Sequence, residues 1–100
     1  MVTDSVIQLP TQVWQRIVQL GVERHIQELE AQLEETQQQI AEFERRFGMS
    51  FVDLQQEGLP EDADWQVHED WVEWSSWEGL KTDLEQQLAS LRAMPEPTGA

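Results

Sequence analysis

Few side chains in this 100-residue sequence could perform acid-base or metal chemistry. The segment His68, Glu69 and Asp70 has the composition of a metal site, but helical metal ligands need a spacing of three or four residues and no second histidine follows. The other histidine, His25, falls on the surface of a predicted helix. The chain has no cysteine, no glycine-rich phosphate loop and no Ser-His-Asp order. We therefore expect no enzyme activity, no catalytic residues, no metal and no cofactor.

Tryptophans and acidic residues instead gather in one stretch that is suited to binding another protein. On a helix, three indoles at positions 71, 74 and 77 form a band that one partner helix can hardly cover, and tryptophan anchors dominate protein interfaces. We expect Trp77 to face away from the neighbouring helix. The alternative is that Trp71 and Trp74 are core residues, packed between the two helices of a hairpin. The candidate partner-binding residues are Trp71, Trp74, Trp77, Glu69, Asp70, Glu73 and Glu78.

The charge of the chain restricts the kind of partner. Twenty acidic and six basic side chains give a net charge of -14, and nine acidic residues without a Lys or Arg lie between Phe47 and Leu80. This run is either a solvated surface or the source of a negative field that steers a basic partner. The charge also opposes binding to phosphate backbones and anionic lipids. We expect a basic protein partner, and no binding of the free chain to nucleic acid or to membranes.

The spacing of apolar residues predicts an all-α fold built from two long helices. A first seam follows a heptad pattern that only Thr36 interrupts, and a second seam runs from Val67 to Leu91 through Leu80. They predict helices near residues 22–47 and 66–93, whose similar lengths favour an antiparallel hairpin. The first seam comprises Val22, Ile26, Leu29, Leu33, Thr36, Ile40, Phe43 and Phe47.

The connection between the two seams contains the signals of a short capping helix. Gly48 is a natural stop for the first long helix. Ser50 can cap a new helix, and Met49 can pack on Leu54 as a hydrophobic staple. We expect a helix of about residues 51–57 that covers the open end of the hairpin.

The chain divides into three segments by composition and apolar register. Residues 1–21 are expected to form a strand-like stretch and a short helix that could serve dimerisation, residues 22–94 the hairpin, and residues 95–100 a disordered tail. A break or a kink is expected near Gly21, because the apolar register slips by about two residues where glycine weakens a helix by about 1 kcal/mol.

Length and composition predict one soluble domain. Leu, Ile, Val and Phe number only 25, which suits a narrow seam better than a thick globular core. No apolar run approaches about 18 residues, and the start of the chain lacks the pattern of a signal peptide. Together with the absence of cysteine, this predicts a cytoplasmic protein.

Two short motifs are similar to segments of a known protein group. They are Gly48-Met49-Ser50-Phe51 and the segment from His68 to Trp74, which reads HEDWVEW. Across roughly residues 40–85 the chain resembles a group of small acidic proteins of archaea and cyanobacteria that serve as antitoxins in two-gene toxin-antitoxin modules. The resemblance implies a cognate basic toxin as the partner that the acidic, tryptophan-bearing helix neutralises. The alternative is a structural coiled-coil hairpin that forms a homo-oligomer or acts as an adaptor.

The opening segment of residues 6–13 is similar in outline to the strand and helix that begin ribbon-helix-helix repressors. Those proteins read DNA from basic or amide side chains and hold phosphates with nearby cations. Here Gln8 is accompanied by Asp4, and Arg16 is the only cation before the first glycine. A ribbon at this position would therefore serve dimerisation rather than DNA reading.

Overall fold

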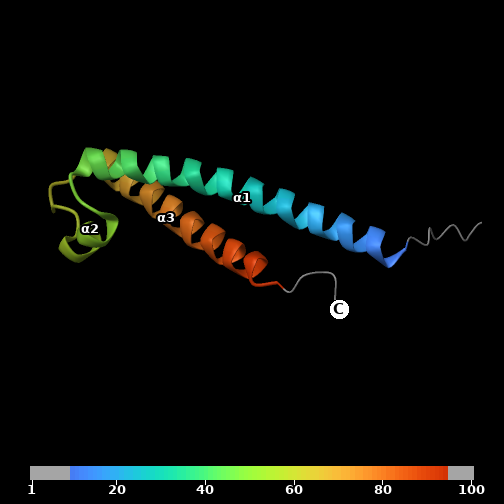
Figure 1. The fold of residues 1–100 in the computed structure, drawn as a ribbon. Helices are drawn as coiled ribbons and strands as arrows, with labels where there is room; N and C mark the ends of the chain where they lie inside the picture. The colour runs from blue at the N-terminus through green and yellow to red at the C-terminus, as the bar shows by residue number, and fades with distance from the viewer. Residues whose placement is uncertain (1–9, 95–100) are drawn as a thin grey trace, which may run out of the picture.

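The structure is a computed structural model that describes residues 10–94, in which three helices and no strand occur. The helices are α1 (Thr11–Phe47), α2 (Phe51–Glu57) and α3 (Trp65–Arg92). α1 and α3 pack against each other as a hairpin, and α2 lies at its closed end (Figure 1). The predicted all-α hairpin with a short capping helix is thus confirmed. The predicted strand-like stretch and the tail of residues 95–100 lie outside the described residues.

Local signals fix where each helix begins and ends. Gly48 ends α1 in the left-handed conformation at φ 70°, and its N–H donates to the Glu44 carbonyl oxygen at 2.8 Å. The Ser50 hydroxyl accepts a hydrogen bond of 3.1 Å from the Asp53 N–H, which confirms the predicted cap of α2. Asp64 caps α3 in the same way. The chain reverses direction in the connection between Phe47 and Trp65, which contains α2.

α1 is one continuous helix, so of the two alternatives predicted near Gly21, a break or a kink, the break is wrong. A single glycine costs about 1 kcal/mol relative to alanine, which is too little to end a helix flanked by good helix formers. The slip in apolar register instead means that the apolar side chains before Gly21 lie on a different side of α1 from those after it. At 100° per residue, a slip of two residues turns the line of Val13, Ile17 and Leu20 by about 160° from the seam that faces α3.

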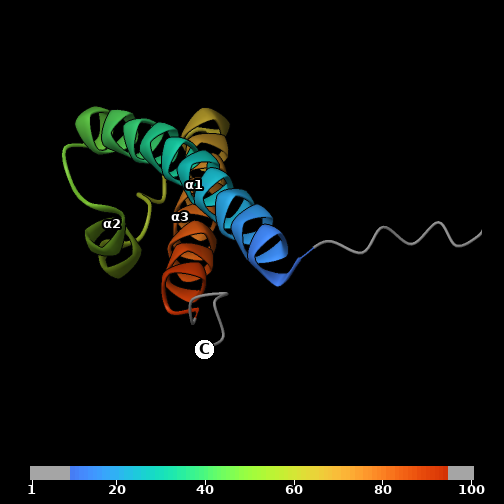
Figure 2. The ribbon, with the colours of Figure 1, turned by 45° about the vertical axis from the view of Figure 1, so that its right-hand side comes forward.

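The first ten residues of α1 form a projecting segment, which we call the N-terminal arm (Thr11–Leu20). α1 has 37 residues and α3 has 28, and the arm extends past the end of α3 (Figures 1 and 2). Its apolar side chains are each between 41% and 51% exposed. They are Val13, Trp14, Ile17, Val18 and Leu20.

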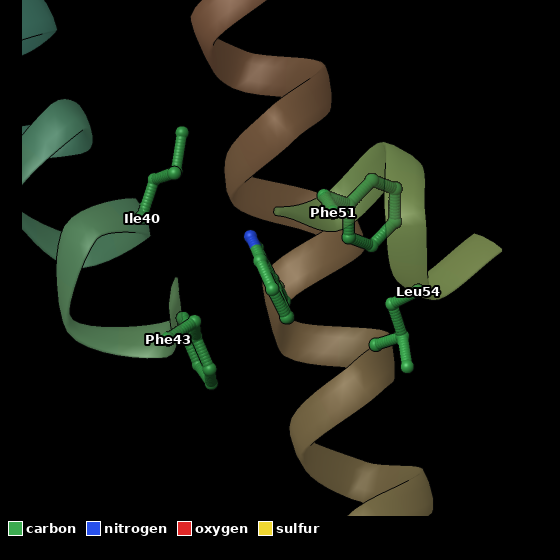
Figure 3. Packing of buried hydrophobic residues seen from close by; sticks show 5 residues of the cluster. Ile40, Phe43, Phe51 and Leu54 are labelled. Carbon is green, nitrogen blue, oxygen red and sulfur yellow. The ribbon is translucent and has the colours of Figure 1, made fainter. Parts of the chain in front are cut away.

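The hairpin contains two separate hydrophobic clusters. The tip cluster lies at the closed end and contains Ile40, Phe43, Phe51, Leu54 and Trp74. Figure 3 shows Ile40 and Phe43 approaching from α1, and Phe51 and Leu54 from α2. The leucine cluster lies toward the other end and contains Leu29, Leu84 and Leu88. Since α1 residues of rising number pack against α3 residues of falling number, the two long helices are antiparallel.

A polar step separates the two clusters. Thr36, between the two groups of α1 core residues, is only 1% exposed, and its hydroxyl donates to the Gln32 carbonyl oxygen at 2.8 Å. Lys81 is half-buried at the corresponding part of α3. Leu80, which was predicted to lie in the seam, is 40% exposed. Steps of four and then three residues lead from Trp77 to position 81 and on to Leu84. Position 81, not position 80, therefore faces α1.

Candidate functional site

Trp74, a predicted partner-binding residue, is the centre of the tip cluster. Its exposure is 0%. Its ring centroid lies 5.7 Å from that of Phe43, 5.3 Å from that of Phe47 and 5.2 Å from that of Phe51. These separations are typical of favourable aromatic pairs. Trp74 therefore joins all three helices and is not free to contact a partner.

The other two indoles of the band also belong to the hairpin. Trp71 and Trp77 are half-buried and pack against the tip cluster. The expectation that Trp77 faces away from the hairpin is therefore wrong. That expectation counted a single partner helix, whereas α2 adds a second surface that covers part of the band.

Two of the predicted acidic residues accept hydrogen bonds from these indoles. Trp74 Nε1 donates to Glu78 Oε2 at 3.1 Å, and Trp77 Nε1 donates to Glu73 Oε2 at 3.4 Å. Each pair is four residues apart on α3, so the bonds run along the helix. Glu78 satisfies an indole N–H that packing partly removes from water, whereas the bond between Trp77 and Glu73 is exposed.

The remaining predicted acids differ in their surroundings. Asp70 forms an ion pair with Arg46 of α1, with 3.4 Å between Nη1 and Oδ2, and it accepts a second bond from Gln66. Arg46 also lies over the Phe43 ring, 4.6 Å from its centroid. Glu69 is exposed. The structure thus brings the predicted residues together on α3 but uses most of them for internal contacts.

A hollow at the closed end of the hairpin was not predicted from the sequence. This tip hollow has a volume of about 320 Å³. Two exposed carboxylates, Glu57 and Asp62, stand among its apolar lining. The apolar lining comes from Phe47, Met49, Leu54, Leu59, Pro60, Ala63 and Val67. The sequence signal that could have revealed it is the pair of apolar residues, Leu59 and Pro60, in an otherwise polar connection.

Within the described part of the chain, no cation is paired with the carboxylates around the tip hollow. The nearest cations in the sequence, Arg45 and Arg46, are paired with Glu42 and Asp70. The hydrogen bond from Arg45 holds the pKa of Glu42 below its ordinary value. Among residues 10–94, neither Glu57 nor Asp62 forms an ion pair. The rim of the hollow therefore carries net negative charge.

Trp65 is a further candidate that the predicted set left out. It is the first residue of α3 and is 70% exposed, more than any other large apolar side chain that the structure describes. It follows Asp64, the cap of α3, and lies two residues before Val67 of the tip hollow. An indole this exposed is available for contact with another molecule.

The described part of the chain offers little for metal or membrane chemistry. His25 and His68 are both exposed, and residues 10–94 contain no group of three or more His, Asp or Glu side chains arranged to hold a metal ion. Within the same range, no helix has the length and apolar character needed to cross a bilayer. Comparisons of the chain with protein-family models, with curated proteins and with solved structures returned no match.

Proposed function

We propose that this protein is an acidic binding module that neutralises a basic partner protein, the role that an antitoxin performs, and that the tip hollow is the contact site. The observation that carries the proposal is an apolar hollow with unpaired carboxylates on its rim. Such a site combines a place for an apolar anchor with charge that favours a cation beside it.

The size of the tip hollow fits a side chain better than a cofactor. Its volume of about 320 Å³ is at the lower end of the range of about 300–1,000 Å³ for small-molecule pockets. An apolar side chain of the partner would bury the exposed edges of Leu59 and Val67. Burial of such an anchor at the centre of an interface supplies most of the affinity in many complexes.

The rim carboxylates would contribute differently from the hollow. Glu57 and Asp62 are exposed, so a Lys or Arg of the partner would pair with them without a large desolvation cost. Exposed charges of this kind mainly increase the rate of association and make it depend on salt. The net charge of -14 strengthens the same effect over a longer range. Both contributions select a basic protein surface.

The experiment is co-production of the chain with the product of the adjacent reading frame. We expect that product to inhibit growth, the parent chain to restore growth, and the two proteins to copurify. The double variant Glu57→Lys and Asp62→Lys should weaken their association by about tenfold or more, because it reverses the charge of the rim. Its matched control is Glu34→Lys and Glu35→Lys, which changes the net charge equally at exposed positions of α1.

Two outcomes would overturn the proposal at different levels. If the adjacent product neither inhibits growth nor binds the parent chain, the antitoxin role is wrong. If it binds but the rim variant and the control weaken binding equally, the general charge matters and the tip hollow is not the contact site.

A further inference from the structure

The N-terminal arm carries a second apolar face that α3 does not cover. Its five large apolar side chains are exposed along ten residues of helix. Because the line of Val13, Ile17 and Leu20 is turned by about 160° from the α3-facing seam, a longer α3 would not cover it either. The arm therefore needs a different partner for its apolar face.

The surface of the arm has the geometry of a coiled-coil hole. A hollow of about 390 Å³ is lined by Val13, Arg16, Ile17 and Leu20, together with Gln12. The first four are at positions i, i+3, i+4 and i+7, and four residues with this spacing form the hole that receives a side chain from a facing helix. The shape of the hollow thus indicates a helix as the occupant.

Charge indicates that this helix comes from a second copy of the chain. Two chains of net charge -14 repel each other over most of their surfaces. Residues 10–22, in contrast, contain one cation, Arg16, and no acidic residue. Among the described residues, the arm lies in the longest run without a carboxylate, so two copies can approach there without bringing carboxylates together.

We infer that two copies pair through their N-terminal arms as antiparallel helices, with Ile17 of one copy packed on Leu20 of the other. Val13, Ile17 and Leu20 follow the 4,3 spacing of a coiled-coil seam. A twofold axis between residues 18 and 19 makes the contact reciprocal, because residue i meets residue j and j meets i.

The same register places two further pairs opposite each other. Arg16 and Glu23 are seven residues apart, so they lie on the same flank of the helix. The twofold axis therefore places Arg16 of one copy beside Glu23 of the other, and Glu23 of the first copy beside Arg16 of the second. Within its own helix Glu23 accepts only a 3.3 Å hydrogen bond from Gln19. On the opposite flank, Trp14 meets Gly21 of the second copy, whose missing side chain leaves open space. Three pairings of different chemistry thus agree on one register.

The first test is the oligomeric state of the full chain by sedimentation equilibrium. The overlapping arms are shorter than a standard interface, so we expect a dimer with a dissociation constant in the micromolar range. Ile17→Glu should raise that constant by tenfold or more. The control is Val52→Glu on α2, which alters another exposed apolar residue and should leave the dimer unchanged. A parent chain that is monomeric at millimolar concentration, or equal effects of both variants, would overturn the inference.

A charge exchange tests the register. Arg16→Glu and Glu23→Arg should each weaken the dimer, because each places like charges opposite one another. The double variant should restore it to within about threefold of the parent, since the exchange rebuilds both ion pairs. Failure of the double variant to recover, with circular dichroism unchanged, would contradict the antiparallel register.

Orientation can be measured directly because the chain contains no cysteine. A spin label on Gln12→Cys would lie about 20 Å along the helix from its counterpart in the antiparallel pair, and about 10 Å away in a parallel pair. The shorter distance would show a parallel dimer and overturn the proposed arrangement.

Discussion

The tip cluster and the leucine cluster hold the same two long helices together by different means. The tip cluster surrounds a fully buried indole with three aromatic rings and draws on all three helices. The leucine cluster is aliphatic, and its members come from α1 and α3 alone. A pair of helices can bury only a narrow seam, whereas a third helix provides a wall behind a large side chain. The width of the indole band is therefore explained by α2.

Replacement of Trp74 by alanine should have the largest effect on stability. The side chain is fully buried and contacts both other helices, so we expect the free energy of unfolding to fall by about 3–5 kcal/mol. Urea denaturation followed by circular dichroism measures this change. Trp65→Ala is the control, because removal of an exposed indole should change stability by about 0.5 kcal/mol or less. Similar effects of the two variants would contradict the central position of Trp74.

Replacement of Leu84 by alanine should have a smaller but still large effect. Leu84 is buried in the leucine cluster, and a Leu→Ala change in a core costs about 2–5 kcal/mol. We expect a value near the lower limit, because a cluster between only two helices can relax around the lost volume. Denaturation under the same conditions tests the order of the two variants. A loss greater than that of Trp74→Ala would reverse the proposed ranking of the clusters.

The sequence predicted the helices well because their signals are local. The apolar spacing identified the α3-facing residues of α1, and Gly48 and Ser50 marked the ends of two helices. Those signals involve residues within one or two turns of each other. They depend little on how the helices are arranged in space.

The candidate site was harder to predict because it depends on packing between distant segments. Trp77 packs against a cluster whose residues come from all three helices, and Arg46 neutralises Asp70 from a different helix. The tip hollow combines residues from α1, α2, the connection and α3. No spacing rule connects such residues. The register slip at Gly21 was visible, but the sequence did not distinguish a break from a continuous helix with a rotated face.

Removal of the α2 cap should test how far the tip cluster depends on its third helix. Ser50→Ala deletes the hydroxyl that accepts the Asp53 N–H, and the loss of such a cap costs about 1 kcal/mol. We expect thermal unfolding to show this decrease, with the near-ultraviolet signal of the tryptophans weakened first. Ser50→Asp should retain most of the stability because aspartate also caps helices. Equal losses for Ala and Asp would argue against a capping role.

Replacement of Thr36, the buried polar residue between the two clusters, should change the free energy of unfolding least. Thr36→Val keeps the shape of the side chain and removes a hydroxyl whose bond goes to its own helix. We expect stability to rise by up to about 1 kcal/mol, since an apolar residue would join the two clusters. Thr36→Ser, which deletes the methyl group and keeps the hydroxyl, should instead lower stability. A destabilised valine variant would show that the hydroxyl has another stabilising role.

The unbroken course of α1 through Gly21 determines how far apart two binding sites can be held. From the proposed twofold axis to the end of α1 is about 43 Å at 1.5 Å per residue, so two tips in the pair would point in opposite directions roughly 85 Å apart. A compact target could then occupy only one tip at a time. An extended target with basic sites at that separation could occupy both tips and gain avidity, which would be lost if a proline at residue 21 bent the helix.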